Sequence, residues 1–570
     1  MTESLATGTY EVLRNRLREA SADLRERLER LNTARCAVFG NIETRLLSTL
    51  HVTTDHNCVP RDLMTVADRV LVGYNVQFGL KTEIVPEDVF GLYKIDGENA
   101  VLRPTDNLFD DRFRRDFAEL IRYYKHTALQ RFFHRGPHVY FVFQVGKNPT
   151  DIKAFKWTID GDQLIYVDNR SEHEVRFPAQ QAFRWTRATR ESHRTGKHPH
   201  ISIEEIVFVE CVGGDLTIKV EDNTDDGSGI YSEPVENSDQ TLDDAEIYYC
   251  VLGNLVLLKM RPYQEKTFRH LVFSIKRRQV KRLDGIERAC VSLPDDHGVI
   301  FPDGVVLQSG ESKVFDHGLQ GACYERTVAA PSGEDYLYLF SEPASGTYLQ
   351  LRYNLIRREV DIPFLCHGQA FFEDGRMLSF RAEDHAQKHH VLQMWQTPFL
   401  GPNAKPKVSV DSMLYKIGNR DLVRGMAECR EVLQLTERDE SYAGLYVDLV
   451  KQTTDLLDGI YWISRPEAEN LAESLSKIRQ AAAAAVEEFD KVVRVRQETE
   501  AALSTALQQT DETLRAVDRS RFEQIGDFTG RGRTENAARS CLWDCEARHN
   551  RFAGCHGTRA FDGGGGSARS

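Results

Sequence analysis

A run of basic and imidazole side chains is the first feature of the sequence that could do chemistry. Its members are Arg184, Arg187, Arg190, Arg194, Lys197, His198 and His200. Guanidinium groups near aromatic and imidazole rings suit phosphate groups or an acidic partner. We therefore predict a loop here that binds phosphate or a partner, with a solvated basic loop as the simpler alternative.

A second segment has the spacing of a calcium-binding loop. Asp222, Thr224, Asp226 and Glu233 occupy the oxygen-ligand positions one, three, five and twelve, and Gly227 occupies the sharp turn at position six. The flanking segments have the pattern of strands, whereas helices flank that motif. We therefore favour an acidic connection between strands and keep calcium as a weak alternative.

The sequence lacks the motifs that usually carry nucleotide hydrolysis or a nucleophilic serine. No Gly-x-x-x-x-Gly-Lys-Ser/Thr phosphate loop occurs in the 570 residues, and no Gly-x-Ser-x-Gly nucleophile turn occurs either. The sequence therefore predicts that this chain is not an enzyme by itself, with no catalytic residue and no cofactor of its own.

The elements that would position these groups are mainly strands. Residues 1–35 have apolar side chains at helical spacing (among them Leu17, Leu24 and Leu31), which predicts an amphipathic or coiled-coil helix. Residues 36–410 contain many short apolar runs, such as HVYFVFQVG and DYLYLF, separated by Gly, Asp, Asn or Pro turns. So many antiparallel strands favour an irregular β-propeller-like body, with two packed sandwiches as the alternative.

The chain returns to helices after this body. We expect a helical hairpin over residues 411–465 and one long coiled-coil helix over residues 466–528. Periodicity is lost over residues 529–570, which we interpret as a disordered, out-of-frame tail. The alternative there is a zinc site built from its cysteine and histidine side chains, at Cys541, Cys545, His549, Cys555 and His556. The predicted fold is mixed and mainly β.

The overall composition indicates the cellular compartment and the kind of partner that the chain can bind. Hydrophobic residues make up 41% of the chain, which is enough for a sizeable core. No apolar run approaches the length that spans a bilayer, and eleven cysteines fit a reduced, cytoplasmic protein. The net charge of −13 lacks the basic field of a dedicated nucleic-acid binder, so any nucleic-acid contact would use the local basic loop.

Several long phrases resemble a known family. They are HNCVPRDL (56–63), GYNVQFGLKTE (73–83), KHPHISI (197–203), ECVGGDLTIKVEDNTDDGSGIYSEPV (210–235), LDDAEIYY (242–249), GNLVLLKMRPY (253–263), LPDDHGVIFPDG (293–304), CHGQAFFEDGRMLSFRAED (366–384), WQTPF (395–399) and KIGNRDLVRG (416–425). Together they resemble an uncharacterised bacterial domain family, over about residues 30 to 520. That family forms the N-terminal half of large AAA+ proteins labelled DNA-repair ATPases.

The resemblance implies a division of labour. In the family the ATPase module, with ATP and magnesium, lies C-terminal to this region, and the resemblance supplies no catalytic residue here. We therefore expect a non-catalytic recognition and scaffold region that binds a protein partner or substrate for ATP-driven remodelling, with oligomerisation through the coiled coil. The alternatives are an independent calcium-binding propeller enzyme and a membrane-surface remodelling adaptor that acts through the N-terminal helix.

Overall fold

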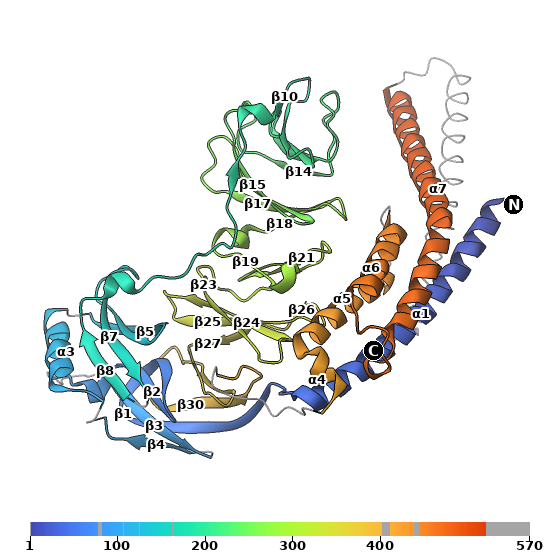
Figure 1. The fold of residues 1–570 in the computed structure, drawn as a ribbon. Coiled ribbons are helices and arrows are strands. Elements are labelled where there is room, and N and C mark those ends of the chain that lie inside the picture. Colours follow the sequence, from blue (N-terminus) through green and yellow to red (C-terminus); the bar gives the residue numbers. More distant parts are fainter. Residues whose placement is uncertain are drawn as a thin grey trace, which may run out of the picture. The chain divides into compact units, whose positions relative to one another are not determined.

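A computed structural model describes most of the chain (Figure 1). The described residues are 2–77, 83–97, 99–105, 108–124, 126–161, 163–401, 411–437 and 444–519. They divide into two compact units. Residues 35–427 form a β unit, and residues 1–34 together with 428–570 form a helical unit, of which 2–34, 428–437 and 444–519 are described. The predicted tail at 529–570 and its alternative zinc residues lie outside the described residues.

The β unit contains six sheets, in which the named strands pair only in antiparallel fashion. The first sheet joins the beginning and the end of the unit. Its strands, in spatial order, are β28 (Gly368–Phe371), β29 (Arg376–Phe380), β30 (Gln387–Gln396), β1 (Arg45–Val66), β2 (Arg69–Val76), β3 (Phe90–Asp96) and β4 (Asn99–Arg103). Because β1 pairs with β30, the two ends of the β unit are held together by backbone hydrogen bonds.

The other five sheets are built mostly from strands that are consecutive in the sequence. The second sheet contains β5 (Ala128–Arg135), β6 (His138–Gln144), β7 (Ile152–Asp160) and β8 (Gln163–Asp168). The third contains β10 (His193–Arg194), β11 (His200–Ile203), β12 (Val207–Glu210), β13 (Asp215–Lys219) and β14 (Tyr231–Pro234). The fourth contains β18 (Gln279–Arg282), β17 (Arg269–Ser274), β16 (Leu255–Arg261), β15 (Glu246–Leu252) and β9 (Thr186–Arg187).

Two smaller sheets complete the β unit. The fifth contains β19 (Val291–Ser292), β20 (Gly298–Phe301), β21 (Gly304–Leu307) and β22 (Ser312–Val314). The sixth contains β23 (Cys323–Ala329), β24 (Asp335–Glu342), β25 (Thr347–Asn354) and β26 (Glu359–Val360), and β27 (Phe364–Cys366) also pairs with β25. These sheets confirm the mainly β prediction. The propeller arrangement stays a prediction.

Short helices fill the connections. The α-helices of the β unit, beyond the end of α1, are α2 (Pro86–Val89), α3 (Asp111–Tyr123), α4 (Met413–Ile417) and the first half of α5 (Asn419–Glu437). Within the described residues, the 3-10 helices are η1 (Glu172–Glu174), η2 (Arg190–Ser192), η3 (Asp284–Glu287), η4 (Pro294–Asp296) and η5 (Pro466–Ala468). Helix α3 begins where the Asp110 carboxylate accepts a hydrogen bond from the backbone N–H of Phe113 at 2.7 Å.

Aromatic side chains form the core between the first and second sheets. Phe90 of β3, Phe113 of α3, and Phe141 and Trp157 of the second sheet are all at most 2% exposed. Their rings meet in tilted, edge-to-face and stacked pairs, such as the edge-to-face pair of Phe113 and Trp157 at 4.7 Å between centroids. This core fixes the second sheet against the first.

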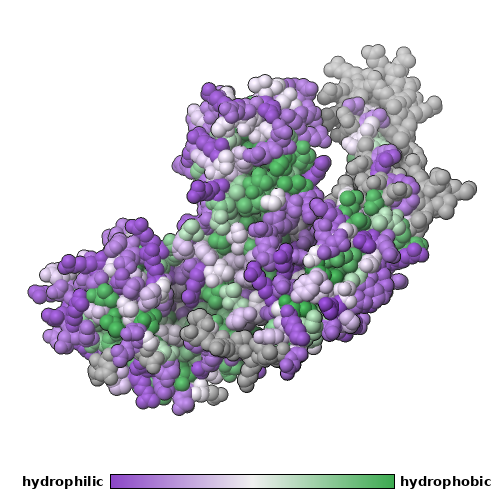
Figure 2. Space-filling view, viewed as in Figure 1, coloured by the Kyte–Doolittle hydropathy of each residue, from purple (hydrophilic) through white to green (hydrophobic). Residues whose placement is uncertain are grey.

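The visible face is mainly hydrophilic, with apolar residues in separate patches (Figure 2).

The helical unit contains α1 (Thr2–Phe39) and α7 (Leu471–Arg519), the two longest of the described helices. It also contains α6 (Leu445–Gly459) and the end of α5. Leu17, Leu24 and Leu31 of the predicted apolar stripe are buried inside this unit, so packing accounts for the stripe. None of the described helices combines the length and the hydrophobicity needed to cross a membrane.

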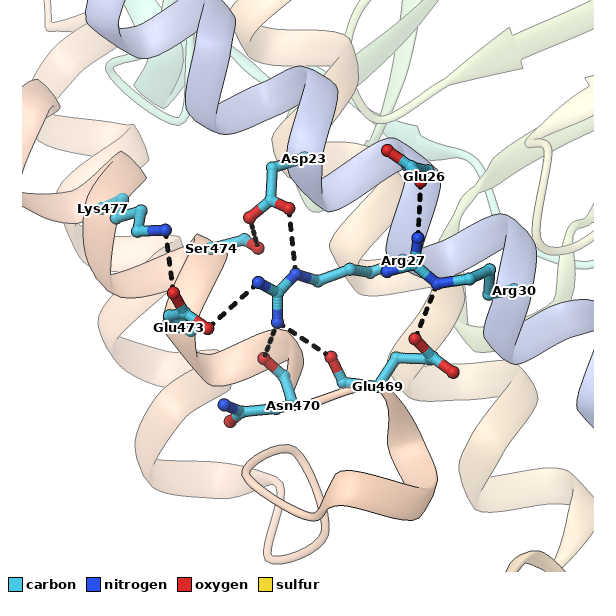
Figure 3. A network of polar contacts seen from close by, with 9 residues as sticks. All are labelled: Asp23, Glu26, Arg27, Arg30, Glu469, Asn470, Glu473, Ser474 and Lys477. Carbon is cyan, nitrogen blue, oxygen red and sulfur yellow. Dashed lines mark hydrogen bonds and ion pairs between the residues drawn. The ribbon is translucent and has the colours of Figure 1, made fainter.

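Arg27 of α1 holds the turn that leads into α7 (Figure 3). Glu469 and Asn470 in that turn have left-handed backbone angles, which cost energy for residues other than glycine. The Arg27 guanidinium donates to both of their carbonyl oxygens, at 3.1 and 3.2 Å. It also binds Asp23 and Glu473, at 3.1 and 3.0 Å. One cation therefore stabilises the turn and joins α1 to α7.

We expect Arg27→Ala to lower the free energy of unfolding by about 2–3 kcal/mol, since hydrogen bonds to a charged group are among the stronger ones. Urea denaturation followed by the helical circular dichroism signal would measure this. Arg30→Ala is the matched control, because the Arg30 side chain is 47% exposed and, among the described residues, forms ion pairs only with Glu26 and Glu469. It should cost less than about 1 kcal/mol. Equal losses for the two variants would contradict the role of Arg27.

Candidate functional site

The predicted basic loop spans parts of two sheets in the structure. Arg187 lies in β9 of the fourth sheet and Arg194 in β10 of the third. Arg184, Arg187 and Lys197 are exposed, and Arg190 pairs with Asp243 at 2.8 Å. Arg187 and Arg194 therefore belong to different sheets, and Arg190 lies in the 3-10 helix η2 between them.

The other basic and imidazole side chains of that loop pair with carboxylates. His198 lies 3.0 Å from Glu210, and the fully buried His200 lies 2.8 Å from Asp222. Arg194 lies 3.5 Å from the other oxygen of Asp222. These pairs are local contacts within the third sheet and the loop that follows β13. Phosphate binding by this loop stays a prediction, which the structure supports only at its exposed arginine and lysine side chains.

The four calcium candidates are not brought together. Glu233 lies in β14, where Arg269 and Arg282 bind its carboxylate at 2.8 and 3.1 Å. Asp222 faces His200, and the Asp226 carboxylate accepts two hydrogen bonds from Ser228. The backbone carbonyl of Thr224 accepts a hydrogen bond from the His198 N–H. Within the described ranges, no group of three or more histidine, cysteine, aspartate or glutamate side chains could hold a metal ion.

A different site lies where the first, second and sixth sheets meet. A cavity of about 830 Å³ there is lined by residues of β1, β5, β23, β25 and β28, and by loop residues that include Arg176, Phe177 and Phe399. This volume is within the range of small-molecule sites. We call it the three-sheet pocket.

β-Bulges lie in three of the strands that line this pocket. The pairing register shifts between Pro60 and Asp62 in β1, between Leu129 and Arg131 in β5, and between Tyr324 and Arg326 in β23. A bulge re-aims the side chains next to it and is frequent beside functional sites. Asp62 and Arg131 directly follow their bulges, and Glu325 is itself the extra residue of the third.

Asp62 connects all three sheets. One carboxylate oxygen accepts a hydrogen bond from the backbone N–H of Phe132 in β5 at 2.7 Å and from the Tyr348 hydroxyl in β25 at 2.9 Å. The other oxygen accepts from the Leu63 N–H at 2.8 Å. Burial raises the pKa of Asp62 to about 7, although these hydrogen bonds and the nearby Arg131 lower it.

Arg131 is a buried cation in the wall of the pocket. It is 7% exposed and pairs with Glu325, with 2.5 Å between the Nη2 and Oε1 atoms. Its guanidinium also lies 5.4 Å from the ring centre of Phe177 and 5.7 Å from that of Tyr348. The Nε atom of Arg131 is buried and has no hydrogen-bond partner among the described residues. Burial opposes its charge, but Glu325, Tyr348 and Asp62 raise the pKa of Arg131 above its ordinary value.

The mouth of the pocket carries more positive than negative charge. Arg135, Arg176 and Arg326 are exposed lining residues, and Glu373 is the exposed acidic one. Arg135 donates to the backbone carbonyl of Glu174 at 3.0 Å, and Arg326 lies over the ring of Phe371. The arrangement suits an anion held at the mouth over an apolar interior.

None of the lining residues was predicted from the sequence as a site residue. Asp62, Arg131 and Glu325 are far apart in the chain, and only Asp62 lies in one of the family phrases, HNCVPRDL, which assigns it no role. A weak signal exists in LQRFF, where Arg131 interrupts an apolar strand segment. The bulges shift the alternation of inward and outward side chains, so the pattern could not place these charges in one pocket.

A family match covers most of the chain. Residues 23–461 match the family DUF3686, described as "ATPase involved in DNA repair". The chain belongs to this family. The resemblance drawn from the sequence phrases is therefore confirmed at the level of a DNA-repair ATPase family. The matched range includes the whole β unit and so the three-sheet pocket.

Other comparisons give little beyond this family. No curated protein sequence matches the chain. A member of the DUF4221 family from Bacteroides vulgatus is similar at 8% identity over 63% of this chain and 98% of that one, with a TM-score of 0.21. An oligogalacturonate lyase in complex with manganese shows 10% identity over 44% and 68%, with a TM-score of 0.14. The S. cerevisiae core factor shows 8% identity over 88% and 91%, with a TM-score of 0.20. TM-scores this low carry no argument about fold or function.

The raised pKa of Asp62 predicts a pH-dependent stability. The unfolded chain releases this proton near the ordinary value of 3.8, whereas the folded chain holds it up to about 7. The folded state binds more protons in this window, so the stability contributed by Asp62 falls as pH rises through it. We expect the stability of Asp62→Asn, relative to wild type, to improve by up to roughly 4 kcal/mol across the window.

Urea denaturation of both proteins near the two ends of that pH window would check this. Tyr348→Phe removes one hydrogen bond to the Asp62 carboxylate and should move the upper end of the window to higher pH. A stability difference between wild type and Asp62→Asn that stays constant with pH would contradict the buried, proton-binding carboxyl.

Proposed function

We propose that this chain is a non-catalytic recognition and scaffold region of a bacterial AAA+ ATPase of the DNA-repair type. The β unit binds a partner or substrate, and ATP is hydrolysed by a module outside these 570 residues, with magnesium as its metal ion. The family match supports the connection to a DNA-repair ATPase. The sequence supports the division of labour, because its 570 residues contain no phosphate loop.

The observation that carries the recognition role is the three-sheet pocket. It has the size of a ligand site, a buried charge pair and a basic mouth. Its described lining contains no serine, cysteine or lysine. Arg131 and Glu325 pair with each other in its wall, and we assign this pair the role of holding the pocket and orienting the ligand.

The helical unit would position the motor. Helix α7 contains 49 residues, which corresponds to a length of roughly 74 Å at about 1.5 Å per residue. We assign it the role of the arm between the β unit and the ATPase module, with oligomerisation through the same helix. We place the protein in the cytoplasm, which agrees with the eight free cysteines of the described residues.

The purified 570-residue chain should hydrolyse ATP with magnesium no faster than buffer alone. Phosphate release would measure this, with a bona fide ATPase as the positive control. Hydrolysis well above background that is abolished by a single substitution within residues 36–410 would refute the non-catalytic assignment, because the chemistry would then reside in the β unit.

A second experiment tests whether the pocket recognises a partner or substrate. The wild-type chain and the double variant Arg176→Ala/Arg326→Ala would serve as paired baits for proteins and DNA fragments. Recovery of the same partner by the wild-type bait, with clear reduction by the variant, supports recognition through the pocket. Equal recovery by both baits would move recognition to another surface of the chain.

A further inference from the structure

The described lining of the three-sheet pocket pairs guanidinium groups with phenylalanine rings. Arg131 lies over Phe177 at 5.4 Å and Arg326 over Phe371 at 6.0 Å, both measured to the ring centre. Phe177 and Phe371 are half-buried, so part of each ring remains accessible in the pocket. Accessible aromatic rings beside arginine suit a planar ring system that is attached to an anion.

The charges of the lining favour an anion at the mouth. Glu325 already compensates Arg131 in the wall, and Asp62 is held by three hydrogen bonds. Arg135, Arg176 and Arg326 then remain at the mouth against Glu373. No ion pair engages Arg176 or Arg326 within the described part of the chain. Arginine binds phosphate oxygens through two parallel N–H groups, which gives geometric specificity.

The interior offers polar groups to the edge of a base. Gln369, Tyr348 and Asp62 line the cavity. The Gln369 side-chain oxygen already accepts from Gln350, and the Tyr348 hydroxyl donates to Asp62, so the side-chain NH2 of Gln369 is the donor that we assign to the edge of a base. An acidic peptide would match the arginine side chains at the mouth but would present no flat ring to Phe177 and Phe371.

We propose that the three-sheet pocket binds a nucleotide unit, with its phosphate at Arg176 and Arg326 and its base among Phe177, Phe371 and Gln369. This assignment rests on the proposed recognition function and names its ligand class. The unit has two sources, a free nucleotide or a nucleotide of a single DNA strand, and both present the same phosphate, sugar and base.

Equilibrium binding to the full 570-residue chain would test the proposal. The probes are AMP, a short oligothymidylate, inorganic phosphate and a short glutamate peptide, all without magnesium. We expect AMP or the oligothymidylate to bind, and Arg176→Ala/Arg326→Ala to weaken that binding roughly tenfold or more. Phe177→Ala should weaken both of these probes and leave inorganic phosphate unchanged, because Phe177 packs on Arg131 in the wall and on neither arginine assigned to the phosphate.

The matched control is Arg115→Ala/Arg122→Ala, which removes two exposed arginines of α3 that do not line the pocket. It should bind the probes as wild type does. Thermal unfolding would check that the variants are folded. Binding of both AMP and the strand would indicate recognition of any nucleotide, whereas binding of the strand alone would indicate DNA as the source.

Three results would overturn the assignment. They are undiminished binding by the Arg176/Arg326 variant, binding of only the peptide or inorganic phosphate, and no binding of AMP or the oligothymidylate at millimolar concentration. ATP hydrolysis by the chain would refute the proposed function and leave the pocket assignment standing. The two proposals can therefore fail separately.

Discussion

The open edge of β5 is the constraint on which the pocket depends. β5 is the edge strand of the second sheet, and its unpaired backbone groups need partners. Side chains of the first sheet supply them. Asp62 accepts from the Phe132 N–H, Asn75 binds both backbone groups of Leu129, and Arg61 donates to the Gln130 carbonyl. The same Asp62 oxygen accepts from Tyr348 of the sixth sheet, so one carboxylate fixes three sheets around a cavity.

The bulges make this arrangement sterically available. In regular pairing, neighbouring residues of a strand alternate between its two faces. An extra residue in β1, β5 and β23 interrupts that alternation where the sheets meet. Charged side chains can then enter the junction while the adjacent apolar residues stay in the core. The cost of burying Arg131 is offset by Glu325 and by the rings of Phe177 and Tyr348.

The sequence predicted the classes of element well and the site poorly. Alternating apolar runs identified the strands, and the helical spacing of Leu17, Leu24 and Leu31 identified α1. The spacing of apolar residues reflects which side of a single helix or strand is buried, so it is sufficient to identify these elements. The density of cations around Arg187 suggested a binding loop, but Asp243, Asp222 and Glu210 come from other segments and pair with its neighbours. The pocket depends on register shifts and on pairs distant in sequence, which no local pattern contains.

The net charge decides what kind of nucleic-acid contact this chain can make. A net charge of −13 repels a polyanion at long range, so a broad surface for sliding along DNA has no electrostatic basis. Salt screens that repulsion over about 8–10 Å, whereas contacts inside a pocket act at shorter distances. Recognition of a single nucleotide unit by two arginines and two phenylalanine rings needs only such contacts. The acidic surface and the basic mouth are therefore compatible, because they act over different distances.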